Sequence, residues 1–315
     1  MYDTDLMTRI ARMYYEKDMS QQEIAEATYV SRSMVSRMLK KAKEIGIVEI
    51  IIKPTFENYY KYENELEAIF PDCKFLIAYS ENSDVEDEFD AVCSMGASVL
   101  DDNLNNDSIL AVSRGKTVAN TINMLKPERN HPDMHIVQLT GSLFFHDNSK
   151  IDEMNNSQRV ASLYGCKLSR LFAPYLMNDK ETKQIFCKHA ATNEVLEMGC
   201  SVNTFITGVD TILFWRDYLD DKDLSYLSKK NAVGCMWGYF FDENGNIIDS
   251  PLYERAMIPD QNIFTKAEKR ICIANDRFKS HALLGALRGK LCNVLVTNSK
   301  IASRLIDLNN KDLTD

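Results

Sequence analysis

Residues 20–40, SQQEIAEATYVSRSMVSRMLK, contain the signals that decide the fold of the N-terminal segment. Ser20 and Glu23 have the spacing of a capping box, in which the two residues satisfy each other's backbone at the start of a helix. Residues 28–30 predict a turn, and Ser31 is a second favourable N-cap residue. The stretch therefore predicts a short helix, a tight turn and a second helix.

The second helix, expected at about residues 32–44, has one apolar and one basic face. Its apolar stripe consists of Met34, Val35, Met38, Leu39 and Ala42. A further helix is predicted over residues 4–17, and a glycine at position 46 is suited to end the second helix. Residues 47–53 predict a β-branched strand, which leaves a winged form of this all-α domain open.

This arrangement is typical of a helix-turn-helix, whose second helix enters the major groove of DNA. Arginine suits guanine and serine suits several bases, whereas lysines suit phosphates. The residues expected to contact DNA are Ser20, Gln21, Gln22, Ser31, Arg32, Ser33, Ser36, Arg37 and Lys40. The alternative is an amphipathic three-helix bundle with a solvated basic face. Tyr29 stands where a turn of this kind usually has glycine, and a left-handed backbone there would cost about 1 kcal/mol.

The charge of the chain is unevenly distributed. The net charge is −9, but residues 1–53 hold nine basic and eight acidic side chains, and residues 29–43 hold no acidic side chain. A local basic surface, rather than the overall charge, is what meets a phosphate backbone. The net charge therefore does not exclude a nucleic-acid partner.

The composition predicts a globular protein of a reducing compartment. Apolar residues make up 45% and charged residues 26%, and the eight cysteines include no Cys-x-x-Cys pair. Dispersed cysteines of this kind indicate buried thiols rather than disulfides or a zinc site. With no secretory signal or membrane-spanning stretch evident, we expect a cytoplasmic location.

Three regions are predicted: a DNA-binding domain at 1–54, a linker helix at 55–71 and a large domain at 72–315. The apolar stripe of the linker helix, at 57–70, would either pack on its own domain or form a dimer contact. Candidate strands lie at 75–79, 109–112, 135–139, 204–207, 270–274 and 293–296. Candidate helices lie at 86–101, 116–125, 152–164, 180–198, 279–289 and 299–307. This alternation predicts a doubly wound, Rossmann-like α/β domain.

Ligands of such sheets bind in the loops after the strands. The loop Ser113-Arg114-Gly115-Lys116-Thr117 offers hydroxyls, cations and free backbone N–H groups at the start of a helix, which suits an anion. It would otherwise be a simple strand-to-helix turn. Thr140 and Gly141 follow another strand, and Lys279 precedes a later helix, where it would pair with a phosphate or be solvated.

Several motifs resemble the SorC family, bacterial regulators of sugar and sugar-alcohol operons. Those in the N-terminal segment are Tyr14-Tyr15, residues 19–25 and residues 30–40. Those in the large domain are residues 137–141, 173–174, 232–234, 238–245, Lys279, 286–289 and 293–297. The resemblance implies an effector domain like that of glucosamine-6-phosphate deaminase and ribose-5-phosphate isomerase, with a sugar phosphate as ligand.

The sequence departs from the family pattern in its ligand loops. The phosphate loop has the single Gly115 where two glycines are usual, and Asp210 stands in place of a glycine. Cys235 follows the Ala-Val-Gly motif at a position that is commonly acidic and contacts the effector. The resemblance therefore implies a role for Cys235 in effector binding, and the departures imply either a ligand that differs from those of other members or a degenerate site.

We expect a regulator of a carbohydrate-utilisation operon that binds operator DNA as a homodimer or homotetramer and responds to a phosphorylated sugar or sugar alcohol. No catalytic residue, metal or cofactor is predicted. The alternative is an isomerase- or deaminase-like enzyme with an added helical domain. That chemistry needs a positioned general base, and none of the five histidines has a plausible partner in the ligand loops.

Overall fold

The computed structural model describes residues 4–44, 47–48, 56–80, 84–143 and 151–312. The chain forms two compact units, Met1–Lys53 and Pro54–Asp315. In the described parts of both units, no helix is long and apolar enough to cross a membrane.

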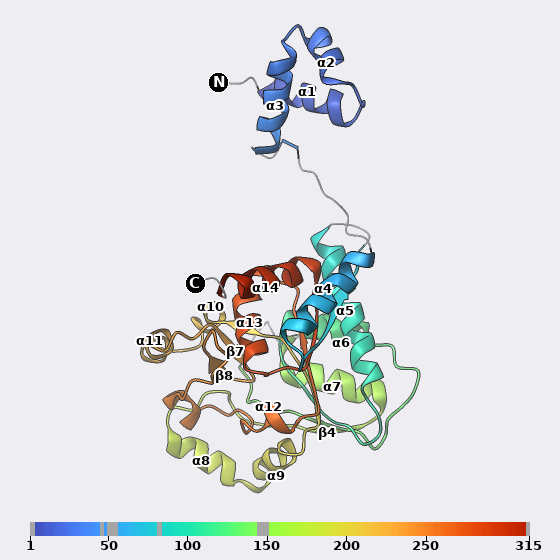
Figure 1. Ribbon diagram of the computed structural model, residues 1–315. Coiled ribbons are helices and arrows are strands. Elements are labelled where there is room, and N and C mark those ends of the chain that lie inside the picture. The colour runs from blue at the N-terminus through green and yellow to red at the C-terminus, as the bar shows by residue number, and fades with distance from the viewer. Residues whose placement is uncertain (1–3, 45–46, 49–55, 81–83, 144–150, 313–315) are drawn as a thin grey trace. The chain divides into compact units, whose positions relative to one another are not determined.

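The smaller unit is built from α1 (Thr4–Tyr15), α2 (Gln21–Thr28) and α3 (Arg32–Glu44) (Figure 1). Its core is a single apolar cluster from all three helices, made of Met7, Ile10, Ala11, Ile24, Ala25, Val35, Met38, Leu39 and Ala42. Ile47 and Val48 form a bend instead of the predicted strand. Residues 49–53 of that strand, and Gly46, lie outside the described residues. The prediction of an N-terminal helix-turn-helix is confirmed.

The larger unit contains a seven-stranded parallel sheet in the order β1-β10-β9-β5-β2-β3-β4. These strands are β1 (Lys74–Ala78), β2 (Ile109–Val112), β3 (His135–Val137), β4 (Lys167–Ser169), β5 (Thr204–Thr207), β9 (Lys269–Ile273) and β10 (Val294–Asn298). A small antiparallel sheet contains β6 (Asp210–Thr211), β7 (Gly234–Met236) and β8 (Tyr239–Phe241). The predicted doubly wound α/β domain is confirmed.

Helices cover both faces of the large sheet (Figure 1). One face is covered by α5 (Val85–Asp102), α6 (Lys116–Met124) and α7 (Glu153–Tyr164). The other is covered by α4 (Phe56–Ile69), α13 (Ser280–Arg288) and α14 (Ser299–Asp312), together with the small sheet. The strands alternate between the two cores: Leu110 and Val112 face the first, whereas Ala111 faces the second.

The remaining helices lie in the connections. They are α8 (Lys180–Lys188), α9 (Ala190–Gly199), α10 (Ile212–Trp215), α11 (Asp221–Lys229) and α12 (Ile263–Lys266), with 3-10 turns at Pro251–Glu254 and Arg277–Lys279. The single helix predicted over 180–198 is two helices, because His189 has an extended backbone (ψ 129°) that no helix can continue through.

Helix α4 covers strand β1 at the edge of the large sheet. One side of β1 pairs with β10, and the other side pairs with no strand of the described sheet. Leu66 of α4 is fully buried in the core of the larger unit. Glu63 accepts a hydrogen bond from Ile77 N (2.8 Å), and Glu67 accepts one from Phe75 N (3.4 Å). The helix predicted as a linker therefore packs its apolar stripe on its own unit and supplies acceptors for a strand edge.

Candidate functional site

Helices α2 and α3 both begin at the caps that the sequence predicts. Ser20 Oγ accepts from Glu23 N (3.3 Å), and the Glu23 carboxylate accepts from Ser20 N (2.8 Å), which completes the capping box. Ser31 Oγ accepts from Met34 N (3.2 Å) at the start of α3. Tyr29 has the left-handed backbone expected at this turn (φ 55°), and its side chain is 97% exposed.

The predicted DNA-contacting residues lie on the outer surface of this motif. All are exposed except Gln21, which is half-buried. Arg37 Nε donates to Ser33 O one turn earlier (3.3 Å), which holds the guanidinium along the exposed face of α3. The geometry suits entry of α3 into a major groove, and the DNA contacts themselves stay a prediction.

A pocket lies at the carboxyl ends of β2 and β5, two strands that are neighbours in the sheet. The chain leaves β2 toward β3 and β4, but it leaves β5 toward β9 and β10 on the other side. Loops that diverge in this way leave a crevice, which is where open α/β sheets bind ligands. The cavity has a volume of about 90 Å³.

The start of α6 forms one wall of this pocket. Its N-cap, Gly115, has φ +122° and offers no side chain to the helix. In contrast to α2, no group of the described residues accepts from the first backbone N–H groups of α6, at Lys116, Thr117 and Val118. Unpaired N–H groups at a helix start attract anions. Lys279 reaches the same pocket from the loop after β9.

Arg114 is held away from this helix start by an ion pair. One of its terminal nitrogens lies 2.6 Å from Asp210 Oδ2, and the two side chains are only 15% and 25% exposed. The guanidinium also lies over two aromatic rings, 4.5 Å from the centroid of Phe214 and 5.0 Å from that of Trp215. The Arg114 charge, which was expected from the sequence to pair with a phosphate, is therefore already neutralised by Asp210.

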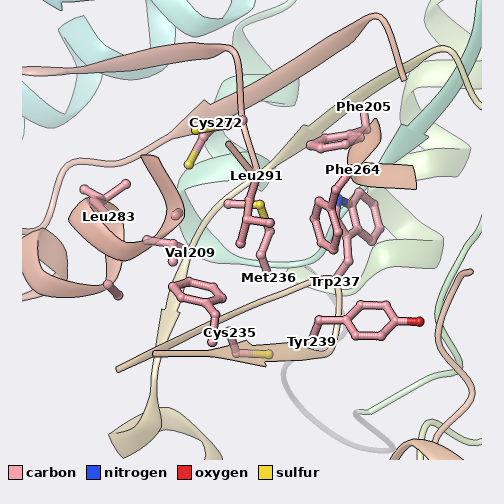
Figure 2. Packing of buried hydrophobic residues seen from close by; sticks show 14 of the residues in the cluster. Phe205, Val209, Cys235, Met236, Trp237, Tyr239, Phe264, Cys272, Leu283 and Leu291 are labelled. Carbon is pink, nitrogen blue, oxygen red and sulfur yellow. The ribbon is translucent and has the colours of Figure 1, made fainter. Parts of the chain in front are cut away.

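Aromatic side chains form the opposite wall. Trp237 and Gly238 make the two-residue turn between β7 and β8, and both have positive φ (52° and 88°), as a type I′ hairpin turn requires. Trp237 packs edge-on against Phe205 at 5.7 Å (Figure 2). Tyr175 packs on Trp215 with ring centroids 5.3 Å apart. Tyr175, Trp215 and Trp237 are each at least 95% buried.

A buried carboxyl group supports the loop after β3. Glu153, the first residue of α7, accepts hydrogen bonds from Leu139 N (2.6 Å), Thr140 N (3.2 Å) and the Thr140 hydroxyl. Burial raises the pKa of Glu153 from 4.5 to about 7, against the opposing effect of these hydrogen bonds. The group therefore positions Thr140 at the pocket wall.

The structure brings eight of the nine predicted effector residues to this one pocket: Ser113, Arg114, Gly115, Lys116, Thr117, Thr140, Cys235 and Lys279. Gly141 does not line it; a Cβ at Gly141 would lie 2.3 Å from Pro174 O, so glycine is needed there for close backbone packing. The Lys116 ammonium lies 5.4 Å from the Phe89 ring centroid, on α5. Whether these residues bind a ligand stays a prediction.

Sequence reasoning missed several residues of the pocket, above all Glu153, Tyr175, Trp215 and Trp237. Only Gly238 signals a turn there, because tryptophan is not a usual residue of a two-residue hairpin turn. Cys235 is fully buried and is the antiparallel partner of Asp210. No cluster of His, Cys, Asp and Glu suited to a metal ion occurs among the described residues.

Comparisons with known proteins agree with this division of the chain. Residues 55–307 match a family model described as "Putative sugar-binding domain", and residues 13–49 match one for winged helix-turn-helix DNA-binding. The chain is 28% identical over 307 residues to a deoxyribonucleoside regulator of Bacillus subtilis, covering 96% of this chain and 97% of that protein. It is 24% identical over 316 residues to the sorbitol operon regulator of Klebsiella pneumoniae, covering 96% and 98%.

Solved structures show the same fold. The full-length sorbitol operon regulator SorC from Klebsiella pneumoniae superposes with a TM-score of 0.75 at 23% identity, covering 97% of this chain and 99% of that one. A sor operon regulator from Shigella flexneri gives a TM-score of 0.73 at 20% identity, covering 79% and 99%. With the sugar-binding model matched over most of its length and a helix-turn-helix before it, the chain belongs to the SorC family of transcriptional regulators.

Proposed function

We propose that this regulator controls a carbohydrate-utilisation operon and that a phosphorylated sugar or sugar alcohol, bound in the pocket, sets its affinity for operator DNA. The observation that carries the proposal is the uncapped start of α6, which faces the same pocket as Lys279. Backbone N–H groups and one lysine make a binding site for a phosphate group. The names of its relatives, regulators of sorbitol and deoxyribonucleoside genes, support a sugar class of ligand.

Binding of the ligand would be linked to DNA affinity through a shift in population. A ligand that binds one conformation of the regulator more tightly than another shifts the protein toward the first. A change of this kind is what a regulator needs to alter its DNA affinity.

We propose further that the pocket is not an active site. Glu153 accepts from two amides and a hydroxyl, and the Asp210 carboxylate is held by Arg114. Neither carboxyl is positioned as an available general base. Release of product from ribose 5-phosphate or glucosamine 6-phosphate by the purified protein would contradict this.

The lysine provides the test of the phosphate site. We expect Lys279→Ala to weaken binding of the sugar phosphate about tenfold or more, since a charged hydrogen bond is lost. The probes are ribose 5-phosphate and sorbitol 6-phosphate, with ribose and sorbitol as unphosphorylated controls. Lys188→Ala, at the exposed end of α8, is the matched control variant. Normal binding by Lys279→Ala, or binding of the unphosphorylated sugars alone, would refute the proposal.

The assembly that we propose is a homodimer or homotetramer in the cytoplasm, where operator DNA is. One helix-turn-helix contacts a single half-site, and paired half-sites need a two-fold assembly. Because the apolar stripe of α4 is buried on its own unit, other surfaces would form the contact. Phe172 and Ile185, which are 74% and 70% exposed, are available for it. Sedimentation of a monomer at micromolar concentration, with and without DNA, would argue decisively against this assembly.

A further inference from the structure

We propose that the Arg114–Asp210 ion pair makes the pocket selective for a ligand with one phosphate group and no second negative charge. The uncharged carbon skeleton of this ligand then receives hydrogen bonds from Tyr175 and Trp237. The inference rests on the proposed function, because it takes the start of α6 as the phosphate site. It goes further by saying which chemical groups can bind at the end of the pocket away from the phosphate, beside Arg114 and Asp210.

Unpaired donors at the aromatic wall indicate that this end of the pocket binds oxygen atoms. The Tyr175 hydroxyl and the Trp237 indole nitrogen are buried and have no hydrogen-bond partner among the described residues. An indole N–H can only donate, so it requires an acceptor. Leaving such groups unpaired away from water costs free energy, which a ligand's hydroxyl or carbonyl oxygens would recover.

The Tyr175 hydroxyl lies between the hairpin turn and the aromatic ring on which Arg114 packs. A Cβ added at Gly238 would lie 2.8 Å from the Tyr175 hydroxyl, so this hydroxyl borders the hairpin turn that contains Trp237. Tyr175 also packs on Trp215, over which the Arg114 guanidinium lies. The Trp215 indole belongs to the same group and lies beside the buried Cys235 thiol.

The charges of the pocket explain the selectivity. Asp210 neutralises Arg114 at 2.6 Å, and Lys116 lies over Phe89. Lys116 and Lys279 are then the pocket cations that make no ion pair among the described residues. Two lysines and a helix start balance the charge of one phosphate group, which is about −2. A carboxylate or second phosphate at the other end would find the Arg114 charge already neutralised by Asp210, and burying an anion without a counter-charge is costly.

The test uses three six-carbon ligands that differ mainly at carbon 1, and the full-length protein, in isothermal titration calorimetry. Sorbitol 6-phosphate carries an alcohol there, glucose 6-phosphate an aldehyde in its cyclic hemiacetal form, and 6-phosphogluconate a carboxylate. Ribose 5-phosphate and ribulose 1,5-bisphosphate extend the comparison to five carbons, and inorganic phosphate tests the α6 site alone. We expect the protein to bind at least one sugar monophosphate and to bind the partner with a second anionic group at least tenfold more weakly.

Two variants test the residues. Asp210→Asn keeps an oxygen for Arg114 but frees its positive charge, so the discrimination against 6-phosphogluconate and the bisphosphate should fall by about tenfold or more. Asp217→Asn, on an exposed side chain of the same segment, should leave the discrimination unchanged. Trp237→Phe keeps an aromatic ring but removes the N–H donor, and it should weaken the binding of the monophosphate about two- to tenfold.

The outcomes separate this inference from the proposed function. If no phosphorylated ligand and no phosphate binds, the proposed function is wrong and the inference falls with it. If monophosphates bind but 6-phosphogluconate and the bisphosphate bind equally well to the wild-type protein, only the selectivity is wrong. The wild-type comparison needs no variant, so it decides the matter even if Asp210→Asn fails to fold. Unchanged monophosphate binding by Trp237→Phe would overturn the role of the indole donor.

Discussion

The buried carboxyl of Glu153 should make the stability of the larger unit depend on pH. The pKa of this group is about 7 in the folded protein, raised by burial, against an ordinary 4.5. The folded state therefore holds the proton more tightly than the unfolded chain. Its stabilising contribution is complete below pH 4.5 and is lost as the pH rises through 7. Glu153→Gln removes this titration and keeps the size of the side chain.

The magnitude follows from the shift. One pKa unit corresponds to ~1.36 kcal/mol. Most of the free-energy change that follows from a pKa raised from 4.5 to about 7 occurs between pH 5 and pH 8. The stability of the wild-type protein, relative to the glutamine variant, should therefore fall by about 2 to 3 kcal/mol over that range. Titrating groups that do not interact with Glu153 are common to both proteins and cancel in the difference.

Urea unfolding at pH 5, 6, 7 and 8, followed by tryptophan fluorescence, measures the effect. Both tryptophans of the chain, Trp215 and Trp237, are in the larger unit beside the pocket, so unfolding of the smaller unit does not enter the signal. Free energies of unfolding come from linear extrapolation at each pH. Parallel profiles for the two proteins, within about 0.5 kcal/mol, would show that the carboxyl is ionised across this range and would refute the reasoning.

Three further predictions concern the caps, the core and the DNA surface. Ser20→Ala should destabilise the smaller unit by about 1 kcal/mol, because Glu23 N loses its acceptor, and an unchanged thermal transition of that unit would contradict this. Leu66→Ala should cost the larger unit about 2 to 5 kcal/mol in urea unfolding, with a loss below 1 kcal/mol as the contrary result. Arg37→Ala should relax operator specificity, whereas Lys40→Ala should weaken all DNA alike and lower the salt slope by about 1. Equal effects of these two changes on specificity would refute the assigned groove face.

Local signals in the sequence predict most of the elements but not their order in the sheet. The apolar runs predict six of the seven parallel strands, because each run is buried on both faces. β4 (Lys167–Ser169) was missed, since it is short, two of its three residues are polar and none is fully buried. The place of β1 beside β10 joins segments more than 200 residues apart in the chain. No pattern within one segment contains that information.

The same limit applies to the pocket. Loops that follow strands could be identified, and they converge because the carboxyl ends of parallel strands share one edge. Arg114 and Asp210 are 96 residues apart, and they pair because β2 lies next to β5. The sequence shows each as a separate departure from the family pattern. Tyr175 lies in an irregular segment and Trp215 in a one-turn helix, where no periodicity marks a buried side.

The contact of α4 with the edge of the sheet determines where the larger unit can be cut from the chain. A fragment that begins at residue 72 lacks Glu63 and Glu67 and leaves the amides of Ile77 and Phe75 without acceptors. Its first strand is then an open edge that can add a strand from another molecule, which leads to aggregation. A fragment that begins at Phe56 keeps the helix and the closed edge. Studies of ligand binding by the isolated unit therefore depend on retaining a helix that does not line the pocket.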